Sequence, residues 1–247
     1  MISVVIPAYN EENYIGACLD SLMRQTLKPG EIIVVDNNST DATVAIAKRY
    51  PVRIVKEKQQ GMIPARNRGF NEAKYDIIAQ TDADTIVPAD WLEKIQEALA
   101  DKSVIAVSGP ATFYDMSANI PKLLFTEFHT IVLLAIQELL GNGYIFGPNK
   151  GLRRSAWEKV KNEVCLNDTE VHEDIDLSIH LSRLGKIKYD SGLVVSSSCR
   201  RWKKIESYFE YTYRGIKSIR RHKRLVVKSH RRHFAGRFPI NKILRPN

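Results

Sequence analysis

Four short and strongly apolar runs recur along the first 80 residues, and each is followed by polar residues. The runs cover residues 2–7, 31–35, 52–55 and 77–80, with helical patterns between them. Continuous apolar runs are typical of strands that are buried on both faces, and strands that alternate with helices form parallel sheets. The sequence therefore predicts an α/β fold with a mostly parallel central sheet flanked by helices.

Polar loops follow three of these strands, at residues 9–12, 36–41 and 82–84. In parallel sheets, ligands bind beyond the carboxyl ends of the strands, so we expect the three loops to form one site. No strand is followed by Gly-x-Gly-x-x-Gly, and no Gly-x-x-x-x-Gly-Lys-Ser/Thr occurs. These absences argue against a dinucleotide oxidoreductase and against a P-loop nucleotide hydrolase.

The third loop carries two carboxylates, Asp82 and Asp84, separated by Ala83. In an extended chain these side chains point to the same side, and two such charges repel by about 1 kcal/mol in water and by more at lower dielectric. A divalent cation with oxygen ligands, Mg²⁺ or Mn²⁺ bound together with a substrate phosphate, would relieve that repulsion. The alternative is an ordinary polar turn that binds nothing.

A second acidic cluster lies at residues 170–176, which hold four acidic residues, and it precedes leucines at helical spacing. Acidic residues in the first turn of a helix offset the helix dipole, which explains one or two of them. The others are candidates for chemistry.

Positive charge is concentrated at the end of the chain. Residues 200–247 contain 16 Lys and Arg against Glu206 and Glu210, while the whole chain carries a formal charge of +9, so the remainder is net acidic. Three roles fit the basic segment: attachment to an anionic membrane surface, which we favour, binding of nucleic acid, or packing of residues 208–219 onto the preceding domain.

The three cysteines, Cys18, Cys165 and Cys199, form no Cys-x-x-Cys pair, so we expect neither a disulfide framework nor a zinc site. The N-terminus lacks a signal-peptide pattern, and the most apolar stretch, residues 131–140, is too short to span a bilayer. We expect a cytoplasmic protein that can attach to the inner face of the membrane.

Together these motifs resemble the family 2 glycosyltransferases, inverting enzymes with a GT-A fold. The matching stretches are residues 3–12, 32–41, 65–69, 82–84 and 172–174. The resemblance implies a glycosyltransferase domain over residues 1–199 and a basic helical extension over residues 200–247. Within the domain, residues 1–108 would be the nucleotide-sugar-binding half, and residues 109–199 would hold the acceptor and the catalytic base.

The resemblance also implies a role for individual residues. Asp174 would be the catalytic base, and its acidic neighbours Glu173 and Asp176 are expected to raise its pKa. Asp84, together with Asp82, would bind Mn²⁺ or Mg²⁺. The donor would be held by Pro7, Ala8, Tyr9 stacking on the base, Glu11 near the ribose, Asp36 bonding the base, Arg66 near base or phosphates, Asp82 and Ala83.

The implied reaction is inverting transfer of a sugar from a nucleotide-sugar, a UDP-sugar before a GDP-sugar, to a glycan or lipid-linked acceptor in cell-envelope synthesis. The chain lacks the Gln-x-x-Arg-Trp motif, which argues against processive synthesis, and it has no His at residues 195–198, where many GT-A enzymes supply a metal ligand. A sugar-phosphate nucleotidyltransferase is an alternative, but it would need a glycine-rich loop at residues 7–10. A non-enzymatic nucleic-acid-binding protein is the other alternative.

Overall fold

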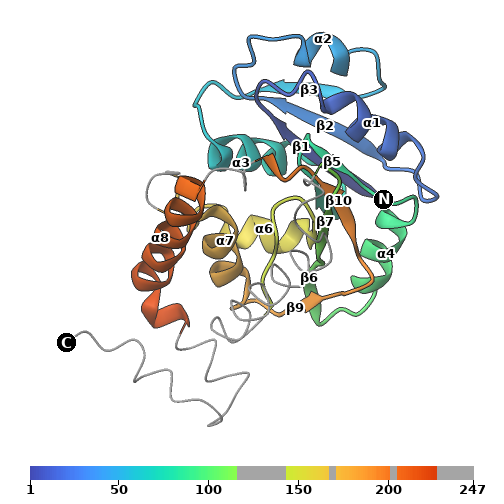
Figure 1. Cartoon of the computed structure of the whole chain (residues 1–247). Helices are drawn as coiled ribbons and strands as arrows, with labels where there is room; N and C mark the ends of the chain where they lie inside the picture. The colour runs from blue at the N-terminus through green and yellow to red at the C-terminus, as the bar shows by residue number, and fades with distance from the viewer. Residues whose placement is uncertain (116–142, 167–170, 201–204, 227–247) are drawn as a thin grey trace.

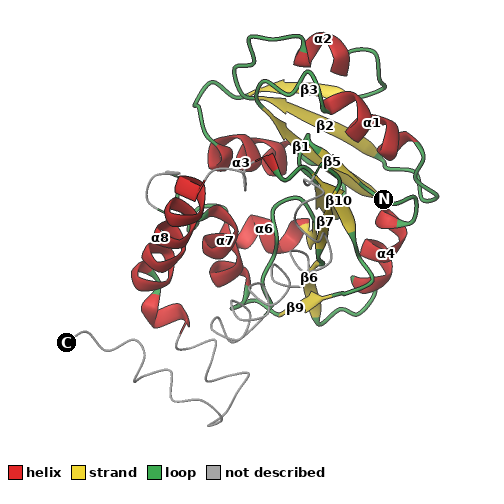
Figure 2. Ribbon diagram, viewed as in Figure 1, coloured by secondary structure: helices red, strands yellow, loops and turns green. Residues whose placement is uncertain are grey.

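The computed structural model describes residues 1–115, 143–166, 171–200 and 205–226. Within them, a seven-stranded sheet runs through the molecule with helices on both faces (Figures 1 and 2). The apolar stretch at residues 131–140 lies outside the described residues. So do Arg201, Trp202 and the chain beyond Val226.

The large sheet has the strand order β3-β2-β1-β4-β8-β6-β9. Its strands are β1 (Ile2–Ala8), β2 (Glu31–Asp36), β3 (Arg53–Lys56), β4 (Ile77–Gln80), β6 (Val104–Ser108), β8 (Lys150–Arg153) and β9 (Lys186–Tyr189). All neighbours pair in parallel except β8, which runs antiparallel to both β4 and β6. The predicted α/β fold with a mostly parallel sheet is confirmed, and the four strands predicted first are its β1 to β4.

Strand β8 was not predicted, because residues 147–151 combine two glycines and a proline, a composition typical of loops. Gly151 instead lies inside β8. A Cβ atom at this position would come within 2.5 Å of Ile95 Cγ2, on the helix above the sheet. The glycine therefore serves close packing of a helix on a strand rather than flexibility.

A small second sheet joins segments that are far apart in sequence, in the order β5-β10-β7. Strand β10 (Val195–Ser197) pairs antiparallel with β5 (Thr85–Ile86) and parallel with β7 (Ala111–Phe113). This pairing places the residues that follow β10 beside the loop that precedes β5, which is the loop with the two aspartates.

Helices cover both faces of the large sheet, and each face has its own apolar core. One core contains residues of α1 (Ile15–Met23), α2 (Thr43–Ala47) and α4 (Trp91–Ala98). The other contains residues of α3 (Met62–Glu72), α6 (Arg154–Val160) and α7 (Glu173–Leu181). Two buried faces explain why the strands read as continuous apolar runs.

The last described helix, α8 (Ile205–Arg221), lies beside α7 (Figure 1). Ile219 and Val226 are buried there against Ile175 and Ile179 of α7 in a third apolar cluster. Of the three roles open for the basic segment, packing onto the domain therefore holds for α8. None of the helices within the described residues is both long and apolar enough to cross a membrane.

Candidate functional site

A pocket of about 210 Å³ lies beyond the carboxyl ends of β1 and β4. Its wall is formed by the loop after β1, the loop with the two aspartates, and the start of α3. The lining residues are Pro7, Ala8, Tyr9, Glu11, Asn37, Gln60, Gly61, Met62, Ala65, Asp82, Ala83 and Asp84. The predicted polar loops therefore do meet at one edge of the sheet.

Two predicted donor-site residues, Asp36 and Arg66, do not line the pocket, although their neighbours Asn37 and Ala65 do. Asp36 ends β2, and its Oδ1 accepts a hydrogen bond from the Ser39 N–H at 2.9 Å. Arg66 is fully buried. Its Nη1 donates to the Glu173 carbonyl oxygen at 3.1 Å, so it connects α3 to the acidic start of α7.

Besides Asn37 and Ala65, three further pocket residues were missed from the sequence: Gln60, Gly61 and Met62, at the start of α3. Gly61 adopts φ 140°, which favours glycine, and its N–H donates to Asn37 Oδ1 at 2.8 Å. A glycine just before a helix with an early proline was the available signal. The strand ends that this glycine faces are set by tertiary contacts, which the sequence pattern does not reveal.

Asp82 and Asp84 lie in a turn, not in an extended strand. The Thr85 N–H donates to the Asp82 carbonyl oxygen at 3.1 Å, which closes the turn, and both aspartates line the pocket. The predicted extended geometry was wrong, because the chain reverses here to enter β5. From the sequence we treated a polar turn and a shared site as alternatives. In the structure the two aspartates lie in a turn and also line the same pocket.

Arg200 brings a positive charge to this acidic loop. Its Nε lies 3.0 Å from Asp84 Oδ2, its Nη2 pairs with Glu11, and its guanidinium carbon lies 4.6 Å from the centroid of the Tyr14 ring. Although we assigned Arg200 to the C-terminal extension, the pairing of β10 with β5 delivers it to the pocket.

The concentrated negative charge of this loop contributes to the raised pKa values of two nearby groups. Burial, followed by the charges of Asp84 and Asp115, raises the pKa of Tyr114 to about 12. Burial also raises the pKa of the Cys18 thiol, and the charges of Asp84 and Asp82 add to the shift. A cation bound at the loop would therefore be electrostatically favoured.

The acidic start of α7 holds Asp174 in a buried ion pair. Lys150 Nζ, fully buried at the first residue of β8, lies 2.6 Å from Asp174 Oδ1, and the Gly147 N–H donates to Oδ2 at 2.9 Å. Burial alone would raise the pKa of Asp174, but the charges of Lys150 and His172 lower it overall. The expected rise was wrong, because the Lys150 ammonium lies against the Asp174 carboxylate and Asp176 turns away toward His222.

The pKa of Glu173 shifts in the opposite direction to that of Asp174. Burial, and then the charge of Asp174, raises its pKa to about 7, and its Oε2 is buried without a hydrogen-bond partner among the described residues. Two adjacent carboxyls with opposite pKa shifts are a common arrangement in sites that move protons.

The profile of the family described as glycosyl transferase family 2 matches residues 3–161, which is more than half of the chain. The chain belongs to this family. Among curated relatives, the glycosyltransferase GlyG of Streptococcus pneumoniae is 32% identical over 147 residues, covering 57% of this chain and 49% of that protein. The chain spans between 16% and 49% of the length of the first curated relatives that it matches.

Comparison with solved structures shows that this chain shares the GT-A fold with its structural neighbours. A mannosyltransferase from Pyrobaculum calidifontis, in complex with GDP-Man and Mn²⁺, aligns with a TM-score of 0.72 at 20% identity over 98% of this chain and 78% of that one. Glucosyl-3-phosphoglycerate synthase from Mycobacterium tuberculosis, in complex with Mn²⁺, UDP and glucosyl-3-phosphoglycerate, aligns with a TM-score of 0.63 at 19% identity, over 90% and 79%.

Proposed function

We propose that this family 2 protein transfers a sugar from a nucleotide-sugar to an acceptor hydroxyl in one inverting displacement. The observation that carries the proposal is that Asp82 and Asp84 share one pocket with Tyr9 and Glu11, at the carboxyl edge of the sheet. That arrangement would place the diphosphate of a nucleotide-sugar near the two aspartates and its nucleotide base near the ring of Tyr9. Neither the nucleotidyltransferase nor the nucleic-acid alternative has a comparable observation in its favour.

Asp84 and Asp82 would hold Mn²⁺ or Mg²⁺, since both offer carboxylate oxygens, which these ions prefer. Asp84 is nearly buried, and a guanidinium already lies against its carboxylate, so the position favours a cation. When bound, the ion would neutralise the charge that develops on the leaving diphosphate. Arg200 would then give up part of its contact with Asp84 and become available to the diphosphate.

Tyr9 supplies the surface for the nucleotide base, because about half of its side chain is exposed at the pocket. Asp36, at the end of the neighbouring strand, would accept a hydrogen bond from the base. Arg66 does not line the pocket, so we assign it the task of holding α7 against α3. We place a UDP-sugar before a GDP-sugar; related structures with each nucleotide are known.

Asp174 is our candidate for the base that takes the proton of the acceptor hydroxyl. Its carboxylate is fixed by Lys150 and by the Gly147 N–H, and the loop around Gly147 belongs to the half of the chain expected to bind the acceptor. Fixing a base in place lowers the entropy cost of the reaction. We expect the acceptor to be a glycan or a lipid-linked sugar, added without processive elongation.

A screen of nucleotides tests the donor and the metal together. Thermal shift with UDP, GDP, CDP and dTDP, each with and without Mn²⁺, should give the largest stabilisation for UDP, and only with the metal. The variant Asp84→Asn should lose this metal-dependent shift. Asp90→Asn, at an exposed ion pair with Lys94, is the matched control and should keep it. Unchanged Mn²⁺-dependent binding in folded Asp84→Asn would overturn the metal assignment.

The outward face of α8 supports attachment to an anionic membrane. Tyr213 and Ile216 are large apolar side chains exposed on this helix, and Arg220 and Arg224 continue the same exposed side at helical spacing. Apolar and cationic side chains on one face are typical of helices that lie in the headgroup region. We propose that this face meets the inner surface of the membrane, where a lipid-linked acceptor would be found.

A further inference from the structure

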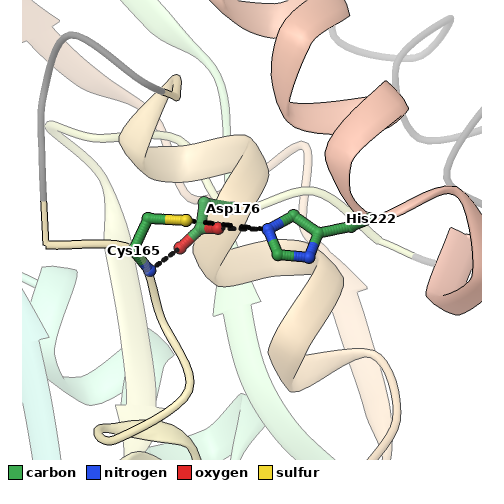
Figure 3. A group of neighbouring side chains, drawn as sticks. All are labelled: Cys165, Asp176 and His222. Carbon is green, nitrogen blue, oxygen red and sulfur yellow. Dashed lines mark hydrogen bonds and ion pairs between the residues drawn. The ribbon is translucent and has the colours of Figure 1, made fainter.

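A second cluster of potential metal ligands lies where α7, α8 and the loop after α6 meet (Figure 3). Cys165 belongs to the loop, Asp176 to α7, and His222 directly follows α8. One ligand atom from each lies within 4.8 Å of the others. None of the three residues lines the candidate donor pocket, and Asp176 contacts His222 rather than the Asp174–Lys150 pair, so this cluster is separate from the candidate donor site.

The distances within the cluster lie on either side of those around a small tetrahedral ion, and the His222–Asp176 hydrogen bond would open slightly to admit it. Cys165 Sγ lies 3.8 Å from His222 Nε2, and that nitrogen lies 2.8 Å from Asp176 Oδ1. Ligand atoms around zinc lie roughly 3.3–3.6 Å apart, given bonds of about 2.0–2.3 Å. The Cys165 N–H donates to Asp176 Oδ2 at 3.0 Å, which leaves Oδ1 directed at the cluster. Such a hydrogen bond orients a ligating carboxylate.

His180 gives an independent indication that a ligand belongs here. It lies one turn after Asp176, is 3% exposed, and neither ring nitrogen has a hydrogen-bond partner among the described residues. Its Nε2 lies 3.8 Å from Asp176 Oδ1, its Nδ1 lies 3.7 Å from Glu163 Oε2, and its ring centroid lies 4.8 Å from that of His222. Burying an imidazole without hydrogen bonds is costly, and a bound cation would remove that cost.

We propose that Cys165, Asp176 and His222 bind a divalent transition-metal ion of the zinc class, with the buried His180 ring next to Asp176 and His222. A thiolate and imidazoles favour zinc, whereas Mg²⁺ and Mn²⁺ prefer oxygen ligands such as those of the pocket. The proposal departs from our expectation of no zinc site, which rested on cysteine spacing, because these ligands come from three separated segments and form no Cys-x-x-Cys pair.

The ion would act as a structural connection. It would join the loop after α6, helix α7 and the end of α8, and thereby fix the basic helix against the helix that begins with Glu173 and Asp174. Binding a metal only in the folded state adds its binding free energy to folding. The inference does not depend on the proposed sugar transfer.

Cobalt substitution of the metal-free full chain tests the site, because Co²⁺ occupies tetrahedral zinc sites and a thiolate ligand gives a near-ultraviolet charge-transfer band. We expect one equivalent of Co²⁺ to produce this band, and Zn²⁺, but not excess Mg²⁺, to abolish it. Cys165→Ser should lose the band. Cys18→Ser and Cys199→Ser are matched thiol controls and should keep it. Cobalt held by Asp82 and Asp84 would give no thiolate band.

The stability of the chain provides a second measurement. Zn²⁺ should raise the Tm of the wild type and leave that of His222→Gln unchanged, with circular dichroism used to verify that each variant is folded. A folded wild type without the thiolate band would mean a hydrogen-bonded cluster only and would overturn the proposal. So would a band that survives in Cys165→Ser, because the cobalt would then lie on another thiol.

Discussion

Asp174 is the residue whose replacement tests the proposed chemistry most directly. Asp174→Asn keeps the shape of the side chain but cannot take up the acceptor proton, so turnover should fall by about 10²–10⁴-fold while donor binding persists. The measurement is release of the nucleotide in the presence of acceptor, alongside calorimetry with the nucleotide.

The same change leaves Lys150 buried without its charge partner, which costs about 3–5 kcal/mol of stability. The double variant Asp174→Asn with Lys150→Met removes the unpaired charge and serves as the control if the single variant does not fold. If Asp174→Asn turns over at the wild-type rate, while Glu173→Gln is inactive, the base is Glu173.

Glu173 makes stability depend on pH. Its pKa is raised from 4.5 to about 7, so it binds its proton more tightly in the folded chain than in the unfolded chain. Its contribution to the free energy of unfolding is therefore present at low pH and is lost as the pH rises from 4.5 to about 7. The full loss corresponds to about 3 kcal/mol.

Glutamine has no such proton to lose, so Glu173→Gln should gain stability relative to the wild type between pH 4.5 and pH 8. Urea denaturation of both proteins at the two pH values measures the difference. A difference that is the same at both values would show that folding does not shift the pKa of Glu173 and would contradict the raised pKa.

At the scale of elements, the contact between α3 and the sheet depends on Gly69. A Cβ atom there would come within 2.2 Å of Val5 Cγ1 on β1 and 2.9 Å of Val35 Cγ2 on β2. Gly69→Ala should therefore cost about 1–3 kcal/mol through overpacking. At Gly16 of α1 the nearest atoms are 3.8 Å away, so Gly16→Ala should stay within about 1 kcal/mol of the wild type. Urea denaturation of both variants would show equal stabilities if this packing argument were wrong.

The elements could be predicted where local pattern and burial agree, and they could not where a tertiary contact decides. The run at residues 31–35 is apolar because both of its faces are covered, so β2 is visible in the sequence. Strand β8 is hidden by Gly147, Pro148 and Gly151, since Gly151 is required by Ile95 on another element.

The same distinction applies to the residues of the candidate site, some of which could be predicted from the sequence and some of which could not. Asp82 and Asp84 follow a strand, so their place at the sheet edge can be inferred from position alone. Arg200 reaches Asp84 only because β10 pairs with β5, over a hundred residues apart. Likewise, the group of Cys165, Asp176 and His222 exists only once α8 has packed on α7.

At the scale of the molecule, the structure indicates where the basic end of the chain can be cut. Val226 is buried in the third apolar cluster, so a chain ending there should keep its fold. It would lose six of the Lys and Arg residues, each worth about 1 kcal/mol at an anionic surface. Co-sedimentation with phosphatidylserine vesicles should therefore be weaker for the shortened chain than for the full chain.

High salt should release both forms, and neutral vesicles should bind neither. Equal partitioning of the two forms, or binding that ignores lipid charge, would remove residues 227–247 from the proposed attachment. A result in which the full chain instead prefers RNA would restore the nucleic-acid alternative.

Strand β8, the one strand of the large sheet that runs antiparallel to its neighbours in the described part of the chain, also sets an order of assembly as the chain leaves the ribosome. Strands β1 to β4 pair with one another and can form a sheet once residue 80 has emerged. Strand β6 has no neighbour in that sheet until β8 inserts between it and β4, more than forty residues later. Lys150 also leaves the ribosome before its charge partner Asp174, which lies 24 residues later in the chain. Amide protons of β1 and β2 should thus become protected against exchange before those of β6, and the unpaired edge of β4 is the surface that a chaperone would have to cover meanwhile.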